Sequence, residues 1–571
     1  MKDIKVKNDE ALKTQNELSE GMDRRAFLQK TTMVFGAAMG ASFVGSLTSL
    51  PVSAASNSSI IESKKVKPKI VFPVISDVHM NKNSNQTLEK FKTTLDQLNL
   101  LVPKQDAFVV VGDLTDNGYT EEYDKFFSTY NAKKQKHAIS LIAIGNHDYW
   151  NGLSVSEAQK RFLERSGMES IYFHKVIKGY HFIILGTEDG LTEGTFSVTQ
   201  INWLEQQLKQ AAQEDPNKPI FVFHHQPIMG TVYGSEWGFA GNRDLFYNTL
   251  AAYPQVISFS GHTHYPLDDP KIIHQKDFTS IGTSTGAYLW LDAGRIQGEV
   301  PEGADILNQA LIVEVYNDKV LLKRRDIHNN NWTAEPFEIT LPANKNDFIY
   351  TEVRDQKAPF FTKDSLISIK HDLTTPTSLA VMFTQAKDDL LVHDYKVEIT
   401  DSTQGKKVKE FLAFSEFYKD PIPNPLTLRI DGLQPNTLYE INVFALDAFG
   451  NQSPNALKVL GKTIDGEIKD ITITLSKNTL TGSTETVDVL VENARVPQGD
   501  WIGLYEVSET PGNVPAIWWE YTTVTNGTYR VSYDPSKNSY PGRYLSGKTF
   551  KFVYFYGSGY DAVTHATFTV N

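Results

Sequence analysis

The chain has 571 residues, which is enough for three or four domains at about 150 residues per domain. Hydrophobic residues make up 40% of the chain and charged residues 22%, which is ordinary globular usage and excludes a disordered, collagen-like or polytopic membrane protein. The net charge of −12 excludes a protein-wide positive field that would attract nucleic acid. The absence of cysteine leaves oxygen and imidazole as the strong metal ligands.

A pair of arginines, Arg24 and Arg25, precedes a weakly apolar run over 31–50. Glycine and serine interrupt that run, so it falls short of the roughly 20 apolar residues of a stable membrane helix. Small residues at 52–54 provide a peptidase site. The segment resembles a twin-arginine export signal, and the alternative is an N-terminal amphipathic or anchoring helix. We expect a signal peptide over 1–54, a linker over 55–66, no stable membrane span, and an exported protein that is extracellular, cell-wall associated, or periplasmic where two membranes exist.

Short β-branched runs alternate with helical patterns over 67–343, which predicts a layered α/β domain, a β-sandwich flanked by helices. One apolar stripe has helical spacing: Leu88, Phe91, Leu95 and Leu98. Two pairs have capping-box spacing and predict two more helix starts: Ser154 with Glu157, and Ser197 with Gln200.

After about residue 344 the helical patterns stop, and the remaining short alternating strands predict two all-β sandwich domains, over 344–465 and 466–571. In the first of these, the stretch 433–439 and the alternating apolar residues after it resemble the late strands of a fibronectin type III sandwich. Tyr439 is the expected corner tyrosine.

Five apolar, strand-like runs of the α/β domain end in residues of the kind that bind metals. These residues are, in chain order, Asp77 and His79; Asp113; Asn146, His147 and Asp148; His224 and His225; and His262 and His264. The carboxyl ends of strands in α/β sheets converge on the ligand crevice, so we expect these side chains to meet there.

A binuclear metal centre needs a carboxylate that spans two cations, with imidazoles and an amide completing each ligand shell. The set of strand-end residues supplies all of these groups. Glycines at 112, 145 and 261 leave space beside the ligands and permit close backbone approach or a positive φ.

The ordered series Asp-x-His, Gly-Asp, Gly-Asn-His-Asp, His and Gly-His-x-His resembles the calcineurin-like metallophosphoesterase superfamily, over roughly 67–341. The resemblance implies one metal held by Asp77, His79, Asp113 and His264, and a second held by Asp113, Asn146, His225 and His262. It implies attack on phosphorus by a metal-bridging hydroxide. It also implies that His147 assists the leaving oxygen and that Asp148 orients His147 or a ligand.

The sequence leaves some assignments at this site open and excludes other residues and metals. The family's His-x-Pro pattern fits His225, and His224 is a neighbour of the ligands, a substrate-facing residue or the ligand itself. Purple acid phosphatases place a tyrosine where this chain has Asp116, so a purple ferric centre is not expected. Manganese, zinc and ferrous iron all suit the donor set. Asp106 and Asp116 are interpreted as turn residues, and His181 as a core histidine.

Two functions fit the sequence. The first is an exported binuclear-metal-dependent phosphohydrolase acting on a phosphomonoester or phosphodiester, with loops 231–243 and 288–306 setting its substrate. The alternative is a surface-polymer binding protein with a catalytically idle metallophosphoesterase scaffold. In it, the C-terminal sandwiches bind a cell-wall or extracellular polymer through Trp501, Trp518 or Trp519, although aromatic residues in sandwiches more often belong to the core. No nucleic acid partner is expected, because the net charge is negative.

Overall fold

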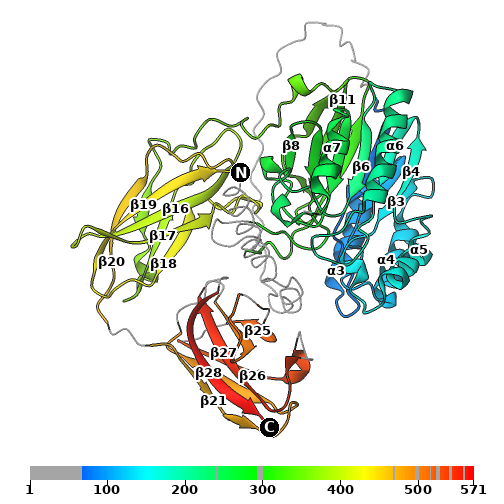
Figure 1. Ribbon diagram of the computed structural model, residues 1–571. Coiled ribbons are helices and arrows are strands. Elements are labelled where there is room, and N and C mark those ends of the chain that lie inside the picture. The colour runs from blue at the N-terminus through cyan, green and yellow to red at the C-terminus, as the bar shows by residue number, and fades with distance from the viewer. Residues whose placement is uncertain are drawn as a thin grey trace, which may run out of the picture.

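The computed structural model describes residues 67–239, 241–291, 300–301, 303–466, 470–494, 500–512, 514, 516–522, 527–538, 543–556 and 560–571. The predicted signal peptide over 1–54 and linker over 55–66 lie outside the described residues. No helix within these ranges is long and apolar enough to cross a membrane. The chain forms an α/β region followed by β-sheets that are mainly antiparallel (Figure 1), which confirms the predicted fold class.

Two sheets form the α/β region, with strand orders β12-β11-β10-β1-β2-β3 and β4-β5-β6-β7-β9-β8; β13 also pairs with β11. The first sheet comprises β1 (Ile70–Ile75), β2 (Ala107–Val111), β3 (Ile139–Ala143), β10 (Gln309–Val315), β11 (Lys319–Asp326), β12 (Asn331–Trp332) and β13 (Phe337–Thr340). The second comprises β4 (Phe173–Ile177), β5 (Tyr180–Ile184), β6 (Ile220–His224), β7 (Val256–Ser260), β8 (Ile273–Gln275) and β9 (Thr279–Gly282). Strands β1 to β3 are parallel, as are β5, β6, β7 and β9, so in each group the carboxyl ends share one edge.

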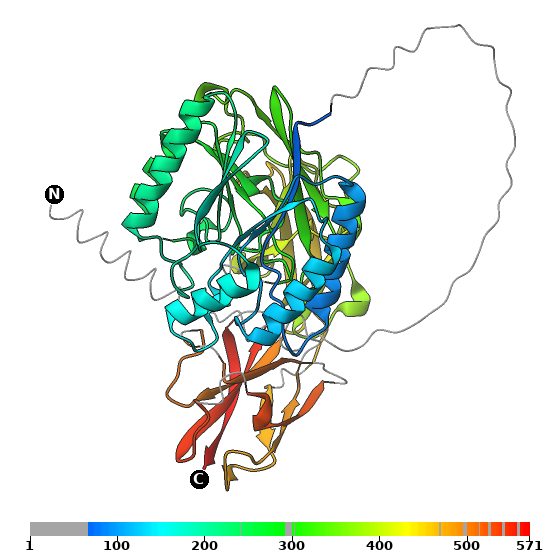
Figure 2. The ribbon, with the colours of Figure 1, turned by 90° about the vertical axis from the view of Figure 1, so that its right-hand side faces the viewer.

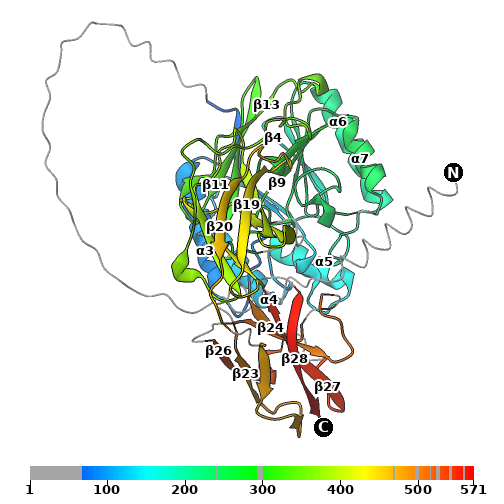
Figure 3. The same ribbon diagram turned by 90° about the vertical axis from the view of Figure 1, so that its left-hand side faces the viewer.

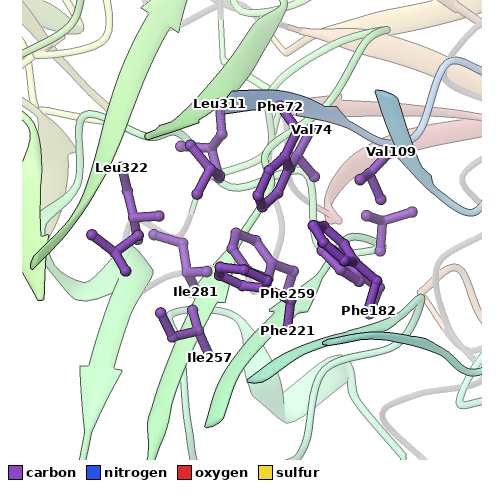
Figure 4. Packing of buried hydrophobic residues seen from close by; sticks show 14 of the residues in the cluster. Phe72, Val74, Val109, Phe182, Phe221, Ile257, Phe259, Ile281, Leu311 and Leu322 are labelled. Carbon is purple, nitrogen blue, oxygen red and sulfur yellow. The ribbon is translucent and has the colours of Figure 1, made fainter. Parts of the chain in front are cut away.

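Large apolar side chains fill the space between the two sheets (Figure 4). The ring of Phe72 on β1 lies 5.0 Å from that of Phe182 on β5 and 5.1 Å from that of Phe221 on β6, both edge to face. Such aromatic pairs contribute packing energy beyond their buried area. They hold the two sheets, and therefore the edges that carry the polar residues, in a fixed relation.

Helices cover the outer face of each sheet, which gives four layers (Figure 2). The first sheet is covered by α3 (Gln86–Leu101), α4 (Thr120–Lys133) and α5 (Val155–Ser166), and the second by α6 (Val198–Glu214) and α7 (Arg243–Ala251). The predicted stripe on α3 buries Phe91, Leu95 and Leu98, while Leu88 is partly buried.

The two predicted capping boxes differ in outcome. At α5 both bonds form between Ser154 and Glu157. At α6 Ser197 accepts from the N–H of Gln200, but the Gln200 side chain bonds the backbone of Gly186 instead. The carboxylate of Glu188 takes its place and accepts from both the N–H and the hydroxyl of Ser197. Both predicted helix starts are confirmed, but at α6 the reciprocal bond of the capping box comes from Glu188 and not from Gln200.

A second, all-β region follows the α/β region, with sheets β14-β15-β18 and β17-β16-β19-β20. Its strands are β14 (Ile367–Ile369), β15 (Ser378–Phe383), β16 (Val392–Asp401), β17 (Lys406–Phe414), β18 (Leu426–Asp431), β19 (Leu438–Asp447) and β20 (Leu457–Lys462). Tyr439 is buried, and its hydroxyl accepts a hydrogen bond from the N–H of Gln434 at 2.8 Å. This contact is the one that a corner tyrosine makes with the backbone a few residues upstream.

The third region contains sheets β21-β23-β26 and β22-β28-β27-β24-β25. Its strands are β21 (Thr472–Leu475), β22 (Thr479–Leu480), β23 (Val487–Glu492), β24 (Trp501–Glu506), β25 (Trp518–Tyr521), β26 (Thr528–Tyr533), β27 (Lys548–Tyr556) and β28 (Asp561–Val570). Trp501 is 7% exposed and Trp518 is 2% exposed, while Trp519 is half-buried. Two of the three tryptophans considered for sugar stacking are therefore core residues.

The second region packs against loops of the α/β region, and its strands β19 and β20 lie in front of that region in Figure 3. An apolar cluster joins Leu289 and Trp290 to Phe414, Phe417 and Tyr418. These contacts involve loop 288–306, one of the two loops expected to set the substrate. The second region thus forms part of the support for that loop.

His393 on β16 forms a polar contact across the same junction. Its Nδ1 lies 2.8 Å from the carboxylate of Asp394, and its Nε2 lies 3.4 Å from that of Asp269 in the α/β region. The hydroxyl of Tyr233, in loop 231–243, lies 3.3 Å from the same Nε2. The buried imidazole of His393 thus lies between two carboxylates and links the two regions.

Replacing His393 with glutamine should destabilise the protein in a pH-dependent way. Burial lowers the pKa of His393, but Asp394 and Asp269 outweigh this and raise the pKa to about 10. A raised pKa stabilises the folded state fully below the unfolded value of about 6.5, and the contribution is lost as pH rises through about 10. We expect a free energy of unfolding about 3 kcal/mol below wild type at pH 6, and a smaller deficit at pH 10.

Denaturant unfolding at both pH values measures this difference. His371→Gln, at an exposed position of the same region, is the matched control. A deficit that is the same at pH 6 and pH 10 would contradict the ionic contact.

Candidate metal centre

The seven predicted ligands follow the ends of five strands, as expected. Asp77 and His79 follow β1, Asp113 follows β2, Asn146 follows β3, His225 follows β6, and His262 and His264 follow β7. Each of these residues is exposed by 1% or less. The first sheet therefore supplies four of the side chains and the second sheet three.

One group of donor atoms comes from Asp77, His79 and His264, and these atoms lie within 4.8 Å of one another. Nε2 of His264 lies 3.1 Å from Nε2 of His79 and 3.1 Å from Oδ1 of Asp77. Nδ1 of His264 donates to the carbonyl of Tyr288 at 3.0 Å, since a carbonyl can only accept. In the neutral ring this bond leaves Nε2 with a lone pair directed at the group, as a metal ligand requires.

A second group comes from Asp113, His225 and His262, whose donor atoms also lie within 4.8 Å of one another. Nε2 of His225 is 3.1 Å from Oδ2 of Asp113, and Nδ1 of His225 donates to the carbonyl of Val111 at 2.8 Å. Asn146 is buried nearby, and its Oδ1 accepts a bond from the amide of Gln226 at 3.3 Å.

Asp113 lies between the two groups. Its Oδ2 is 3.1 Å from Nε2 of His225 in one group and 3.7 Å from Nε2 of His79 in the other. Its Oδ1 accepts from the backbone N–H of His147 at 2.9 Å, which fixes the carboxylate plane. This is the position that a bridging carboxylate would occupy.

Five of the seven predicted ligands have a left-handed backbone conformation. Their φ angles are 51° at Asp77, 46° at His79, 48° at Asp113, 72° at His262 and 60° at His264. Each such residue costs roughly 1–2 kcal/mol, and strain of this kind clusters at functional sites. Backbone bonds hold the turns, with the N–H of Asp77 donating to Gly112 and that of His79 to Asp113, both at 3.1 Å.

Glycines lie against the ligands, as predicted. A Cβ at Gly145 would lie 2.2 Å from Oδ1 of Asp113, and one at Gly261 would lie 2.5 Å from Oδ2 of Asp77. At Gly112, with φ at +82°, it would lie 2.4 Å from Nδ1 of His225. No side chain fits at these positions without moving a predicted ligand.

Neighbouring opposite charges favour the charged forms of Asp77, Asp113 and His225. Burial raises the pKa of Asp77 and Asp113, but the histidines outweigh it, chiefly His264 for Asp77 and His225 for Asp113, and bring both pKa values well below the usual range. Burial lowers the pKa of His225, while Asp113 and Asp77 raise it to about 9. Cations can replace these ring protons, because metal binding to histidine releases them.

The two adjacent histidines, His224 and His225, have different surroundings. Nδ1 of His224 lies 2.6 Å from the carbonyl of Gln226, and its Nε2 lies 2.7 Å from the hydroxyl of Ser258. Its ring packs 5.3 Å from that of Phe246 on α7, and burial lowers its pKa to about 4. His225, and not His224, faces the donor groups.

Asp148 connects the loops that carry two other site residues. Its carboxylate accepts from the hydroxyl of Thr115 at 2.7 Å, the N–H of Thr115 at 3.2 Å and the N–H of Gly145 at 3.0 Å. Burial, together with the charge of Asp113, raises its pKa to about 6. These bonds favour the predicted role of orienting ligands.

His147 lies at the border of the site, with Nε2 3.9 Å from Oδ2 of Asp113. Its Nδ1 donates to the backbone carbonyl of Asp116 at 2.9 Å, and its ring lies 3.7 Å from that of Trp150. The carbonyl bond fixes the orientation of the ring, so that Nε2 is the nitrogen directed toward the donor groups.

Sequence reasoning missed the importance of Asp116. It lies in a bend, as a turn residue would, but its side chain is buried, with Oδ1 3.6 Å from Nδ1 of His79 and 3.9 Å from Nδ1 of His147. The interpretation as a turn residue was therefore incomplete. A signal was available, because this is the position at which purple acid phosphatases place a metal-binding tyrosine.

Residues 70–266, which include all seven predicted ligands, match the calcineurin-like phosphoesterase family. The chain is 30% identical over 173 residues to a probable glycerophosphodiester phosphodiesterase of Arcobacter nitrofigilis, over 29% of this chain and 59% of that protein. It is 26% identical over 205 residues to a 3',5'-cyclic-nucleotide phosphodiesterase of a Nostoc species, over 33% of this chain and 70% of that protein. It is 28% identical over 270 residues to a cAMP/cGMP dual specificity phosphodiesterase of Mycobacterium tuberculosis, over 45% of this chain and 79% of that protein.

Residues 70–266 therefore form a calcineurin-like phosphoesterase domain, and the buried groups of histidine and aspartate are consistent with a binuclear metal site. Histidine nitrogens and carboxylate oxygens in this arrangement suit divalent transition metals. The chain spans 59% of the length of the relative from Arcobacter nitrofigilis.

Gly145→Ala should lower the amount of metal bound, because the new Cβ would displace Asp113, the carboxylate that lies between the two groups. We expect at least a tenfold loss of manganese affinity, measured by titration and elemental analysis of the full chain. Gly482→Ala is the control, since a Cβ there meets nothing within 4 Å. Equal metal content in both variants would contradict the arrangement.

Asp116→Asn should weaken metal binding about 10–100-fold, the usual effect of losing a carboxylate that supports a ligating histidine. The physical reason is the loss of negative charge 3.6 Å from Nδ1 of His79. Asp124→Asn, on the exposed face of α4, should bind metal like wild type. Wild-type affinity in Asp116→Asn would show that Asp116 acts only in the bend.

Proposed function

We propose that this protein is an exported, binuclear-metal-dependent phosphodiesterase. The observation that carries the proposal is the convergence of two buried donor groups on Asp113, within a calcineurin-like phosphoesterase domain. A diester is favoured over a monoester because the three relatives are all named as phosphodiesterases.

In this proposal Asp77, His79, Asp113 and His264 hold one cation, and Asp113, Asn146, His225 and His262 hold the other. Manganese, zinc and ferrous iron all suit these donors. When bound, two such cations acidify a water and neutralise charge on the phosphoryl oxygens.

Side chains around these ligands donate the proton to the leaving oxygen and keep the ligands in position. Protonated His147 donates from Nε2 to the leaving oxygen, since its Nδ1 is already bonded to the carbonyl of Asp116. Asp148 keeps the loops of Asp113 and Asn146 in place through Thr115 and Gly145. The burial of the site strengthens each of these electrostatic interactions.

We propose that the domain boundaries are 67–343, 344–465 and 466–571, with a fibronectin type III-like second domain. The bond between Tyr439 and Gln434 supports that likeness. We also propose export through the signal at 1–54, on the strength of Arg24 and Arg25. The polymer-binding alternative has less support, because Trp501 and Trp518 are buried.

The decisive test is an assay of the chain over 55–571, reconstituted with manganese or zinc. We expect kcat/KM for bis(p-nitrophenyl) phosphate to exceed that for p-nitrophenyl phosphate at least tenfold. His147→Gln should keep its metals and lose about 100-fold in kcat on the diester, the usual contribution of a general acid.

His174→Gln is the matched control, because His174 lies on β4 and pairs with Gln207 and His181 instead of the donor groups. Protein that binds no metal, or that cleaves neither ester with either metal, would overturn the proposal. A preference for the monoester would refute its diester part alone.

A further inference from the structure

A separate cluster of acidic side chains lies where the α/β region joins the second region. Asp355 belongs to the connecting segment, while Asp388 and Asp389 lie in the loop between β15 and β16. Donor atoms of these three residues lie within 4.8 Å of one another. None of the proposed ligands of the metal centre takes part.

Two oxygens of this cluster are buried without a hydrogen-bond partner, namely Oδ2 of Asp355 and Oδ1 of Asp388. Asp355 as a whole is only 5% exposed. Its other oxygen accepts from the N–H of Lys357 at 3.0 Å, and Oδ2 of Asp388 accepts from two backbone N–H groups at 2.8 Å. The backbone thus fixes both carboxylates and leaves one buried oxygen of each unsatisfied.

The charges of the cluster are incompletely balanced. Burial raises the pKa of Asp355, and so do the nearby carboxylates of Asp447, Asp388 and Asp389. Lys357 pairs with Asp389 at 2.5 Å, but its side chain is 75% exposed. The guanidinium of Arg354 donates to the carbonyls of Pro270 and Ile273. A buried acceptor without a donor is costly, so these oxygens favour a cation.

We propose that Asp355, Asp388 and Asp389 bind a divalent cation of the calcium type. The donors are all hard carboxylate oxygens, which calcium prefers, whereas the metal centre is rich in imidazole. Water would complete the six to eight oxygen ligands that calcium takes. The cation would displace the exposed Lys357 from Asp389.

A cation at this position would fasten the connecting segment to the second region. Arg354 already anchors the segment to the α/β region, and the carbonyl of Asp355 accepts from Nδ2 of Asn451 at 3.4 Å. Further along the segment, Phe360 forms an isolated antiparallel β-bridge with Lys387, the residue directly before Asp388. Binding would therefore stabilise the packing of the second region on the α/β region.

Calcium titration of the chain over 55–571, with manganese already bound, tests the proposal. We expect a Kd between about 10⁻⁴ and 10⁻³ M, as in extracellular modules. Asp355→Asn and Asp388→Asn should each weaken binding at least tenfold. Lys357→Gln should tighten it severalfold, because the competing ammonium is gone. Asp364→Asn, an exposed change elsewhere in the second region, should bind like wild type.

Thermal unfolding gives a second measurement. Calcium should raise the Tm of wild type and of Asp364→Asn, and should leave that of Asp388→Asn unchanged. Equal calcium affinity in wild type, Asp388→Asn and Lys357→Gln would overturn the proposal, as would an absence of binding in wild type. If Asp355→Asn fails to fold, the surface variants Lys357→Gln and Asp389→Asn decide the question. Hydrolysis is not a readout, so failure of the phosphodiesterase proposal would leave this result intact.

Discussion

The buried carboxylates of Asp77 and Asp113 impose the main constraint on the α/β region. An ionised carboxylate removed from water costs several kcal/mol unless positive charge and donors surround it. Backbone N–H groups supply part of this need, with His262 donating to Asp77 and His147 to Asp113. In the turns that bring the imidazoles together, five of the predicted ligands have a left-handed backbone conformation. The sheets, turns and glycines thus place donors and imidazoles around the carboxylates of Asp77 and Asp113.

The second region contributes to this arrangement from outside. The loop that packs against Phe414 and Phe417 also provides the carbonyl of Tyr288, which orients His264. The N–H of Trp290, in the same loop, bonds the carbonyl of His264 at 3.2 Å. His264, a predicted ligand, is therefore hydrogen-bonded directly to a loop that packs against the second region. The second region therefore contributes indirectly to the position of His264.

The strands and the seven candidate residues that follow them could be identified from sequence because both signals are local. A β-branched run followed by Asp-x-His or Gly-His-x-His needs no knowledge of distant residues. The choice between His224 and His225 needed the structure, since it depends on which face of β6 meets Ser258 and α7. The partner of Gln200 and the contacts of the Asp116 carboxylate with His79 and His147 also could not be predicted from sequence. Each depends on contacts between segments whose spacing carries no periodic signal.

The division of the donors between two sheets has one more consequence. Asp77, His79, Asp113 and Asn146 follow strands of one sheet, and His225, His262 and His264 follow strands of the other. Neither half of the sandwich holds all seven predicted ligands, so the two donor groups form only once β6 and β7 have joined β1 to β3. A cation bound by side chains of both sheets would therefore stabilise their association, because a ligand that binds only the folded state adds to its stability.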